Sequence, residues 1–225
     1  VSGRVTTSGS GRLVLEQGDY LLNEFSRVSN AGGGGGGTVL LVQSSANVDF
    51  YGVSQSGQWL LNGGVTKLFG GATFAEDSPV LVNGGTLRID ASNCVAGAPV
   101  TVAVIHHTQG SVLVNGFLNN TVLYNMTGAD STLDVGCKQF SQTFVQEEGT
   151  AGGSGLLHTF AAYHWRSGLW SGAGTTRAAL LEIATPAPKR VVARRAESGV
   201  ANWYAGAIAL ESGSVWQILP SGTFT

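Results

Sequence analysis

The chain has 225 residues, of which 34 are glycine and 12% are charged, and its formal net charge is −2. Ordinary soluble domains contain roughly 7% glycine and about 25% charged residues. With twelve Lys and Arg side chains and an isoelectric point near 6.1, the chain lacks the basic surface that nucleic-acid binding requires. No apolar run approaches the ~18 residues of a membrane-spanning helix, so we expect no nucleic-acid partner and no membrane insertion.

The shortage of charge also predicts how the chain is covered. Its mean hydropathy is positive, and it has too few charged side chains to cover the surface of a monomer. We therefore expect a homo-oligomer in which part of the surface packs against other copies. The alternative is a monomeric β-domain with a surface of Ser, Thr, Asn and Gly.

Short strands are expected along the whole chain. Apolar residues form short runs or alternate with polar residues, and Gly, Asn, Ser or Asp ends each run. No segment shows the periodicity of an amphipathic helix. In chain order the expected strands are 13–15, 38–43, 48–53, 59–61, 80–82, 86–89, 100–105, 111–114, 121–124, 132–135, 140–145, 178–183, 191–194, 203–210 and 215–219. Their lengths and spacing predict an all-β sandwich, barrel or solenoid.

Three of the strands end in Asn-Gly, within residues 60–64, 80–85 and 112–116. Both residues tolerate a positive φ, so each pair indicates a turn. Asn83 follows Asn62 by 21 residues and precedes Asn115 by 32. These unequal spacings exclude a strict repeat. The rungs of an irregular parallel β-helix and the successive hairpins of a β-prism both remain compatible with the pattern.

Two glycine-rich stretches divide the sequence. Residues 32–37 are six consecutive glycines, which predict a loop and not a phosphate-binding loop, because Thr38 follows in place of Lys. Residues 149–155 are expected to form a linker, because four of the five tryptophans and most of the arginines follow them. We therefore expect an N-terminal β-domain at 1–148, built as a sandwich, prism or irregular β-helix, and a smaller sandwich-like β-domain at 156–225.

The two cysteines, Cys94 and Cys137, each lie among small apolar residues, so we expect free thiols, with a single disulfide as the alternative. His106 and His107 are adjacent, so on a strand they face opposite sides. His158 and His164 have no ligand-type residue at a suitable spacing. We therefore expect no metal site and no cofactor.

The segment 158–170 is the best candidate for binding a ligand, and Trp203 is a further candidate. The proposed binding residues are His158, Tyr163, His164, Trp165, Arg166, Trp170 and Trp203. Sugar rings stack their C–H faces on aromatic side chains, while His and Arg donate hydrogen bonds to hydroxyl or acidic groups. The alternative is that these aromatic residues form a core or a seam between subunits.

The one dense basic run contains Lys189, Arg190, Arg194 and Arg195, interrupted by apolar residues. This alternation is more typical of a strand with one solvated face than of a phosphate-binding patch.

The sequence contains no motif of a known catalytic site, so we expect no catalytic residue and no enzyme. Asp130 and Asp134 are four residues apart and could lie on one face of a strand. Two carboxylates are the minimum for glycoside hydrolysis, which remains an alternative.

The Asn-Gly-ended strands, the scarcity of lysine and helix, and the C-terminal stretch 206–225 resemble bacteriophage tail fibres, tail spikes and capsid fibres. The resemblance implies an extracellular homotrimer in a virion, in contact with other virion proteins, that attaches to the host by binding a surface polysaccharide. One alternative within it is a capsid-decorating or spike-forming structural protein without a specific ligand. The other is a tail spike that degrades polysaccharide.

Overall fold

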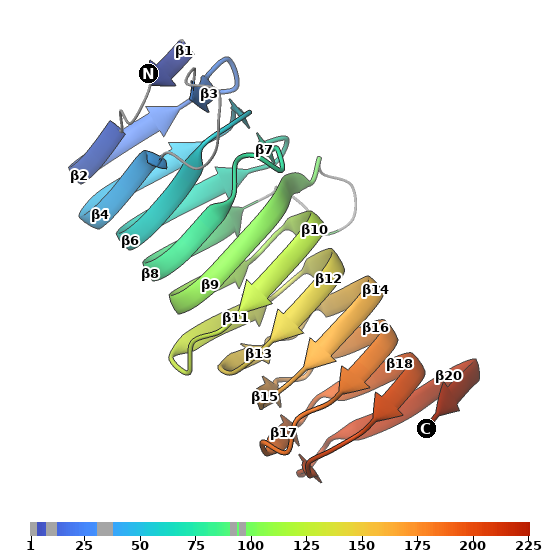
Figure 1. The fold of residues 1–225 in the computed structure, drawn as a ribbon. Helices are drawn as coiled ribbons and strands as arrows, with labels where there is room; N and C mark the ends of the chain where they lie inside the picture. Colours follow the sequence, from blue (N-terminus) through green and yellow to red (C-terminus); the bar gives the residue numbers. More distant parts are fainter. Residues whose placement is uncertain (1–3, 8–12, 31–37, 91–93, 95–97) are drawn as a thin grey trace.

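The computed structural model describes residues 4–7, 13–30, 38–90, 94 and 98–225 (Figure 1). This part of the chain is all-β, as expected, and contains no helix. The strands are β1 (Arg4–Thr7), β2 (Leu13–Leu22), β3 (Arg27–Asn30), β4 (Thr38–Phe50), β5 (Val53–Ser54), β6 (Gln58–Phe69), β7 (Thr73–Phe74), β8 (Val80–Asp90), β9 (Val100–Val114), β10 (Phe117–Met126), β11 (Ser131–Val135), β12 (Lys138–Gln146), β13 (Thr150–Gly152), β14 (Leu156–Trp165), β15 (Gly168–Ser171), β16 (Thr175–Ile183), β17 (Lys189–Val192), β18 (Arg195–Trp203), β19 (Ile208–Leu210) and β20 (Val215–Phe224). The glycine run 32–37 lies outside the described residues.

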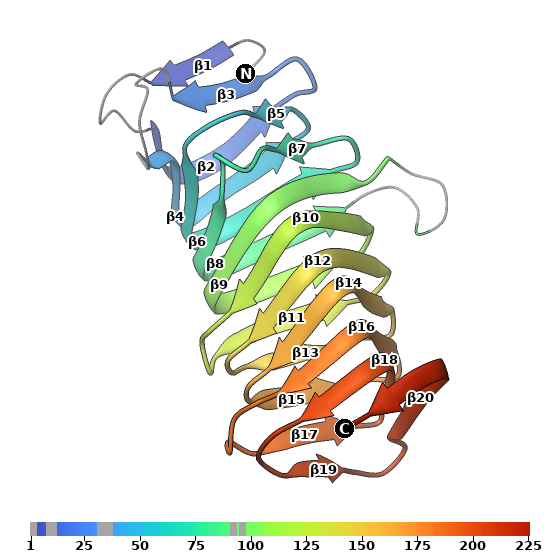
Figure 2. The ribbon, with the colours of Figure 1, turned by 45° about the vertical axis from the view of Figure 1, so that its right-hand side comes forward.

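The strands wind into a parallel β-solenoid of about nine turns. Apart from the neighbours of the long strand β9, each strand pairs in parallel with the strand two places further along the chain. Phe117, for example, pairs with Lys138, 21 residues later, and Lys138 pairs with Leu156, 18 residues later. Figures 1 and 2 show the turns stacked along one axis from the N-terminal to the C-terminal end.

Strand segments at equivalent positions of successive turns form three parallel stacks, which we call faces 1, 2 and 3. Register shifts, such as the one between Asn120 and Leu123, divide most long strands into two segments. Face 1 consists of β1, β3, β5, β7 and the first segments of β9, β10, β12, β14, β16, β18 and β20. Face 2 consists of the segments 13–15, 40–42, 59–61, 80–82, 104–107, 123–126, 143–146, 162–165, 180–183, 200–203 and 223–224. Face 3 consists of the last segments of β2, β4, β6, β8 and β9, followed by β11, β13, β15, β17 and β19.

The core fills the interior of the solenoid, because alternate side chains of each strand point inward. Phe50, Trp59 and Phe74 form one aromatic cluster, with ring centroids 4.8 to 5.2 Å apart. Further along, Tyr124 stacks on Phe144, which in turn stacks on the ring of Tyr163, at 4.7 Å in each step. Full burial of each such side chain contributes roughly 1.5–3 kcal/mol.

The sandwich-like C-terminal domain is not present. Within 156–225 each strand pairs in parallel with a strand of the next turn, so this part continues the solenoid. The stretch 149–155, expected to be a linker, contains β13, which pairs with both β11 and β15. The change in composition there does not interrupt the pairing of strands.

The Asn-Gly pairs mark corners between faces and not hairpins. Asn62 and Asn83 lie at the corner between faces 2 and 3 in consecutive turns, close to glycines with positive φ at 64 and 85. Asn115 lies at a different corner, after face 3. The rungs of an irregular β-helix are therefore the correct alternative, and the unequal spacing arises because the third pair occupies a different position in its turn.

The expectation of free thiols is wrong. Cys94 and Cys137 form a disulfide that closes a sequence separation of 43 residues. Their Cα atoms lie 5.4 Å apart, a distance that neither local sequence context could indicate. In the described part of the chain, no helix is long and apolar enough to cross a membrane.

Candidate functional site

Three of the seven proposed binding residues belong to the core. Tyr163, Trp165 and Trp170 are at most 1% exposed. The Trp165 and Trp170 rings stack at 4.0 Å, and the buried Gln146 Oε1 accepts hydrogen bonds from Tyr163 Oη and Trp170 Nε1. These side chains contact one another inside the solenoid, so they are not available to a ligand at its surface.

The other four lie on the surface but do not form one site. His158 is on face 1, whereas His164 is on face 2, where its Nδ1 lies 2.7 Å from Glu182. Arg166 follows β14 and pairs with Glu147 at 2.6 Å. Trp203, at the end of β18, packs edge-on against Phe224.

The basic run is divided between the interior and the surface, contrary to the expected solvated strand face. Arg190 and Arg195 are exposed, but Lys189 and Arg194 are 1% exposed. The Arg194 guanidinium donates hydrogen bonds to Thr176 Oγ1 and to the carbonyls of Gly153, Ser171 and Thr175. Burial lowers the pKa of Arg194 to about 10, so it remains charged at neutral pH. Through these hydrogen bonds the Arg194 side chain links neighbouring turns inside the solenoid.

Phe117, Phe140, His158 and Phe160 form an aromatic patch on face 1. Phe140 lies at its centre, with ring centroids 5.0 Å from Phe117, 5.7 Å from His158 and 5.4 Å from Phe160. Phe160 is 49% exposed, and the other three are partly exposed. An exposed apolar cluster of this kind is uncommon on a soluble protein and is often a binding surface.

The parallel register of the strands explains why Phe140 and His158 lie side by side. Asn119, Phe140 and His158 occupy the same outward position in successive turns of face 1, and Arg177 and Glu197 continue the same row. Phe160 lies in the register shift between Thr159 and Ala162, at the corner between faces 1 and 2. A bulge of this kind directs side chains outward and bends the strand.

An ion-pair cluster adjoins the aromatic patch. The Glu197 carboxylate accepts hydrogen bonds from Arg177 Nε and Arg195 Nε, both at 2.6 Å, and Arg195 also donates to Gln217. Burial raises the pKa of Glu197, but the two arginines outweigh this effect and bring it below its ordinary value. Both guanidinium groups remain partly exposed, so they can still donate to a ligand.

His158 connects the two groups. Burial and the nearby positive charge of Arg177 lower its pKa, and the charge of Glu197 only partly opposes them. At neutral pH its ring is therefore neutral, with one donor and one acceptor nitrogen. Such a group suits a hydroxyl-bearing ligand better than an anionic one.

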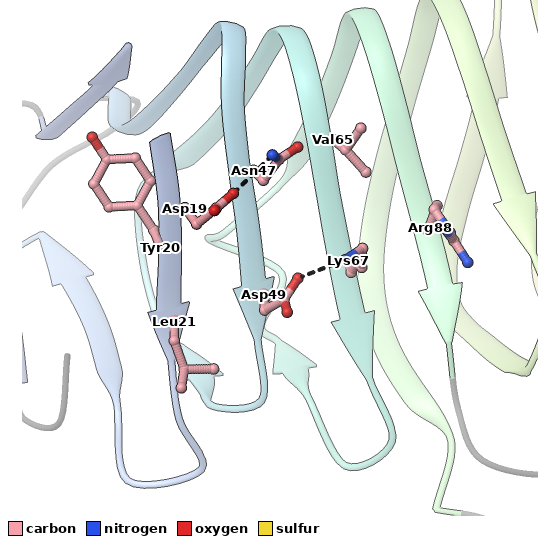
Figure 3. A pocket seen from close by; sticks show the side chains of 8 residues that line it. All are labelled: Asp19, Tyr20, Leu21, Asn47, Asp49, Val65, Lys67 and Arg88. Atoms are coloured by element: carbon pink, nitrogen blue, oxygen red, sulfur yellow. Dashed lines mark hydrogen bonds and ion pairs between the residues drawn. The ribbon is translucent and has the colours of Figure 1, made fainter. Parts of the chain in front are cut away.

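A polar hollow of about 570 Å³ lies on face 3 near the N-terminal end (Figure 3). Asn47 donates to Asp19 at 2.8 Å, and Lys67 lies 3.3 Å from Asp49 across neighbouring strands. Arg88, at the far side, pairs with Asp90 at 3.1 Å. Exposed pairs of this kind contribute little to stability. Each of the charged side chains named here has an opposite charge or a hydrogen-bond partner.

The carboxylates considered for hydrolysis are both exposed. Asp130 lies in the turn before β11 and Asp134 within it, on the outside of face 3. In the described residues no three His, Cys, Asp or Glu side chains are grouped as metal ligands would be.

His158 is among the residues predicted from the sequence, and Phe160 lies within the candidate segment 158–170, but neither Phe117 nor Phe140 was singled out. Aligning the chain on the 18- to 21-residue offsets of the register would place Phe140 beside His158. That signal becomes visible only once the strands are known to pair in parallel.

Comparison of the chain with protein-family models, with curated proteins and with solved structures found no match.

Proposed function

We propose that this protein is a virion appendage of the tail-fibre or tail-spike type that attaches to a host by binding a surface glycan at the aromatic patch. The observation that carries the proposal is the exposed cluster of Phe140 and Phe160 beside the neutral His158 and two partly exposed arginines. The β-solenoid is compatible with such a role and equally with others.

The chemistry of the patch suits a sugar. The C–H face of a pyranose ring packs on aromatic rings and gains by leaving water. His158 can donate to one hydroxyl and accept from another, while Arg177 and Arg195 offer further donors. Turns spaced by ~4.8 Å present this chemistry in consecutive rows along the solenoid axis, which favours a chain of sugars over a single compact ligand.

Two further features support a place outside the cell. The disulfide between Cys94 and Cys137 is of the kind that persists in oxidising surroundings. The strands pair from end to end without a break among the described residues, which suits a stiff, elongated appendage.

The proposal is tested on an array of bacterial surface polysaccharides. Replacing Phe140 or Phe160 by Ala removes a stacking ring, so each variant is expected to bind its glycan at least tenfold more weakly, the equivalent of about 1.4 kcal/mol. Affinity is then measured by calorimetry on the best glycan.

Phe25→Ala is the matched control, because Phe25 is 74% exposed and lies between β2 and β3, outside the patch. It is expected to bind like the original chain. Absence of any glycan signal from the original chain, or equal losses in Phe25→Ala and Phe160→Ala, would contradict the proposal.

A further inference from the structure

Charge is distributed unequally among the three faces. In the described residues, the strand segments of face 2 contain a single Asp, Glu, Lys or Arg, which is Glu182. A single row of face 3 already contains three charged residues, Asp49, Lys67 and Arg88. Face 1 carries the Arg177–Glu197–Arg195 cluster. Of the three faces, face 2 therefore has the fewest charged side chains in the part of the chain that the structure describes.

Two rows of side chains point outward from face 2 in the turns from β9 to β18. The first is apolar apart from Thr143 and runs through six consecutive turns in register: Val104, Leu123, Thr143, Ala162, Leu180 and Val200. These residues alternate with core residues such as Tyr124 and Leu181, so their side chains lie on the outside. Val200 is 37% exposed and the other five are partly exposed.

The titratable groups on this face include a paired carboxylate. The Glu182 carboxylate lies 2.7 Å from Nδ1 of His164, its partner in the same row on the preceding turn. His106 is the other titratable side chain directed outward from the face. All three belong to the second outward row, which is polar apart from Val145 and consists of His106, Asn125, Val145, His164, Glu182 and Asn202. Covering the face would bury no carboxylate without a partner, which is the arrangement that would cost most.

Parallel sheets are usually covered on both sides, and their strands then contain continuous apolar runs. The segments 13–15, 59–61 and 80–82 are such runs, and all three belong to face 2. The side chains that point out of these segments include Leu60 and Leu81, which are paired in register. The sequence of these three segments is that of a sheet buried on both sides.

We propose that face 2 is the surface through which this chain packs against a second copy of itself. A second copy has the same spacing between turns, ~4.8 Å, so rows of side chains on the two copies can interdigitate along their length. The face extends over about nine turns, or ~40 Å, and four residues span ~13 Å. Its flat area is therefore ~500 Å², to which the relief of the outward side chains and the two corners add, against the ~800 Å² per partner of a standard interface.

This assembly would also bring the aromatic patch to the seam between copies. Phe160 lies at the corner between faces 1 and 2, beside Ala162 of the apolar row. The two proposals nevertheless fail separately, because one is read from mass and the other from glycan affinity.

The test is the mass of the chain in solution by light scattering after size-exclusion chromatography. The original chain is expected at a multiple of its 23.1 kDa. Leu123→Lys and Leu180→Lys each place a charge in the interface and are expected to run at 23.1 kDa. Leu169→Lys is the matched control, because Leu169 points outward from face 3, and it is expected to keep the oligomeric mass.

A double variant, Leu123→Thr with Leu180→Thr, guards against misfolding, because Thr retains a strong preference for strands. Far-ultraviolet circular dichroism checks that each variant is folded. A monomeric original chain would overturn the proposal and leave face 2 to a different partner. Folded variants that keep the oligomeric mass, or dissociation of Leu169→Lys as well, would also overturn it.

Discussion

The interior of the solenoid holds polar side chains whose ionisation is set by burial. His107 is fully buried; its Nε2 lies 2.9 Å from the carbonyl of Gly110 and its Nδ1 lies 3.1 Å from Tyr124 Oη. Because a carbonyl only accepts, Nε2 carries the proton and Nδ1 accepts from the tyrosine. Burial lowers the pKa of His107 to about 4, although the Gly110 hydrogen bond opposes the shift.

His107 should therefore make the fold sensitive to acid. The unfolded chain binds a proton at this residue near pH 6.5 and the folded chain only near pH 4. Stability is thus fully present above pH 6.5 and falls as the pH drops toward 4, by about 3 kcal/mol in total. Urea unfolding at several values of pH, compared with His107→Gln, measures this contribution. The same pH dependence in both proteins would show that another group is responsible.

At the scale of elements, the corner between faces 2 and 3 depends on stacked glycines. Gly64, Gly85 and Gly110 all have positive φ, between 66° and 86°, in consecutive turns. A Cβ on Gly85 would lie 2.5 Å from the carbonyl carbon of Gly63 in the turn before it. Both the φ and the close approach of the two backbones therefore require glycine.

Gly85→Ala is expected to lower the free energy of unfolding by about 3 kcal/mol, because it combines backbone strain with a steric clash. Gly71→Ala separates the two effects. Gly71 has a φ of 90°, but nothing lies within 4 Å of an added Cβ, so only the strain of about 1 kcal/mol applies. Urea unfolding of both variants checks the difference, and equal losses would show that the stacking at the corner is unimportant.

At the scale of the whole molecule, each turn contacts its neighbours and little else, so stability is close to a sum over turns. The disulfide is an exception, because it joins Cys94, between β8 and β9, to Cys137, between β11 and β12. By closing a separation of 43 residues it restricts the unfolded chain.

Replacing both Cys94 and Cys137 by Ser is expected to lower the free energy of unfolding by about 2–4 kcal/mol. Urea unfolding of this variant, beside the original chain with and without a reducing agent, measures the loss. Reduction should reproduce the effect in the original chain and leave the double variant unchanged. If the variant is as stable as the original chain, the disulfide adds no restraint beyond that of the paired strands.

Face 2 is also a property of the whole molecule, since no single strand reveals it. Each turn contributes one or two outward apolar residues, such as Leu123 or Leu180, which are unremarkable alone. Only the parallel register aligns them into one row. The composition of the chain predicted that some surface is covered, but it did not indicate which one.

The candidate site shows where sequence patterns stop being informative. Phe140 and Phe144 are four residues apart and would share a face on a regular strand. The register shift between Ser141 and Thr143 reverses this, so Phe140 points out to the aromatic patch and Phe144 into the core. In the segment 158–170, the same alternation buries Tyr163 and Trp165 and leaves His158 outside. The sequence marked the region but could not sort its side chains.

By itself, the sequence determined the all-β class and the changes of chain direction at the Asn-Gly pairs, because these follow from alternation and from the φ that single residues tolerate. Only the tertiary structure decided that the strands pair in parallel, that one solenoid continues through 149–155, and that Cys94 meets Cys137. The physical reason is that each strand finds its partners in other turns, about 18 to 28 residues away. Local preferences are nearly the same for parallel and antiparallel pairing, so the choice is made by the packing of whole turns.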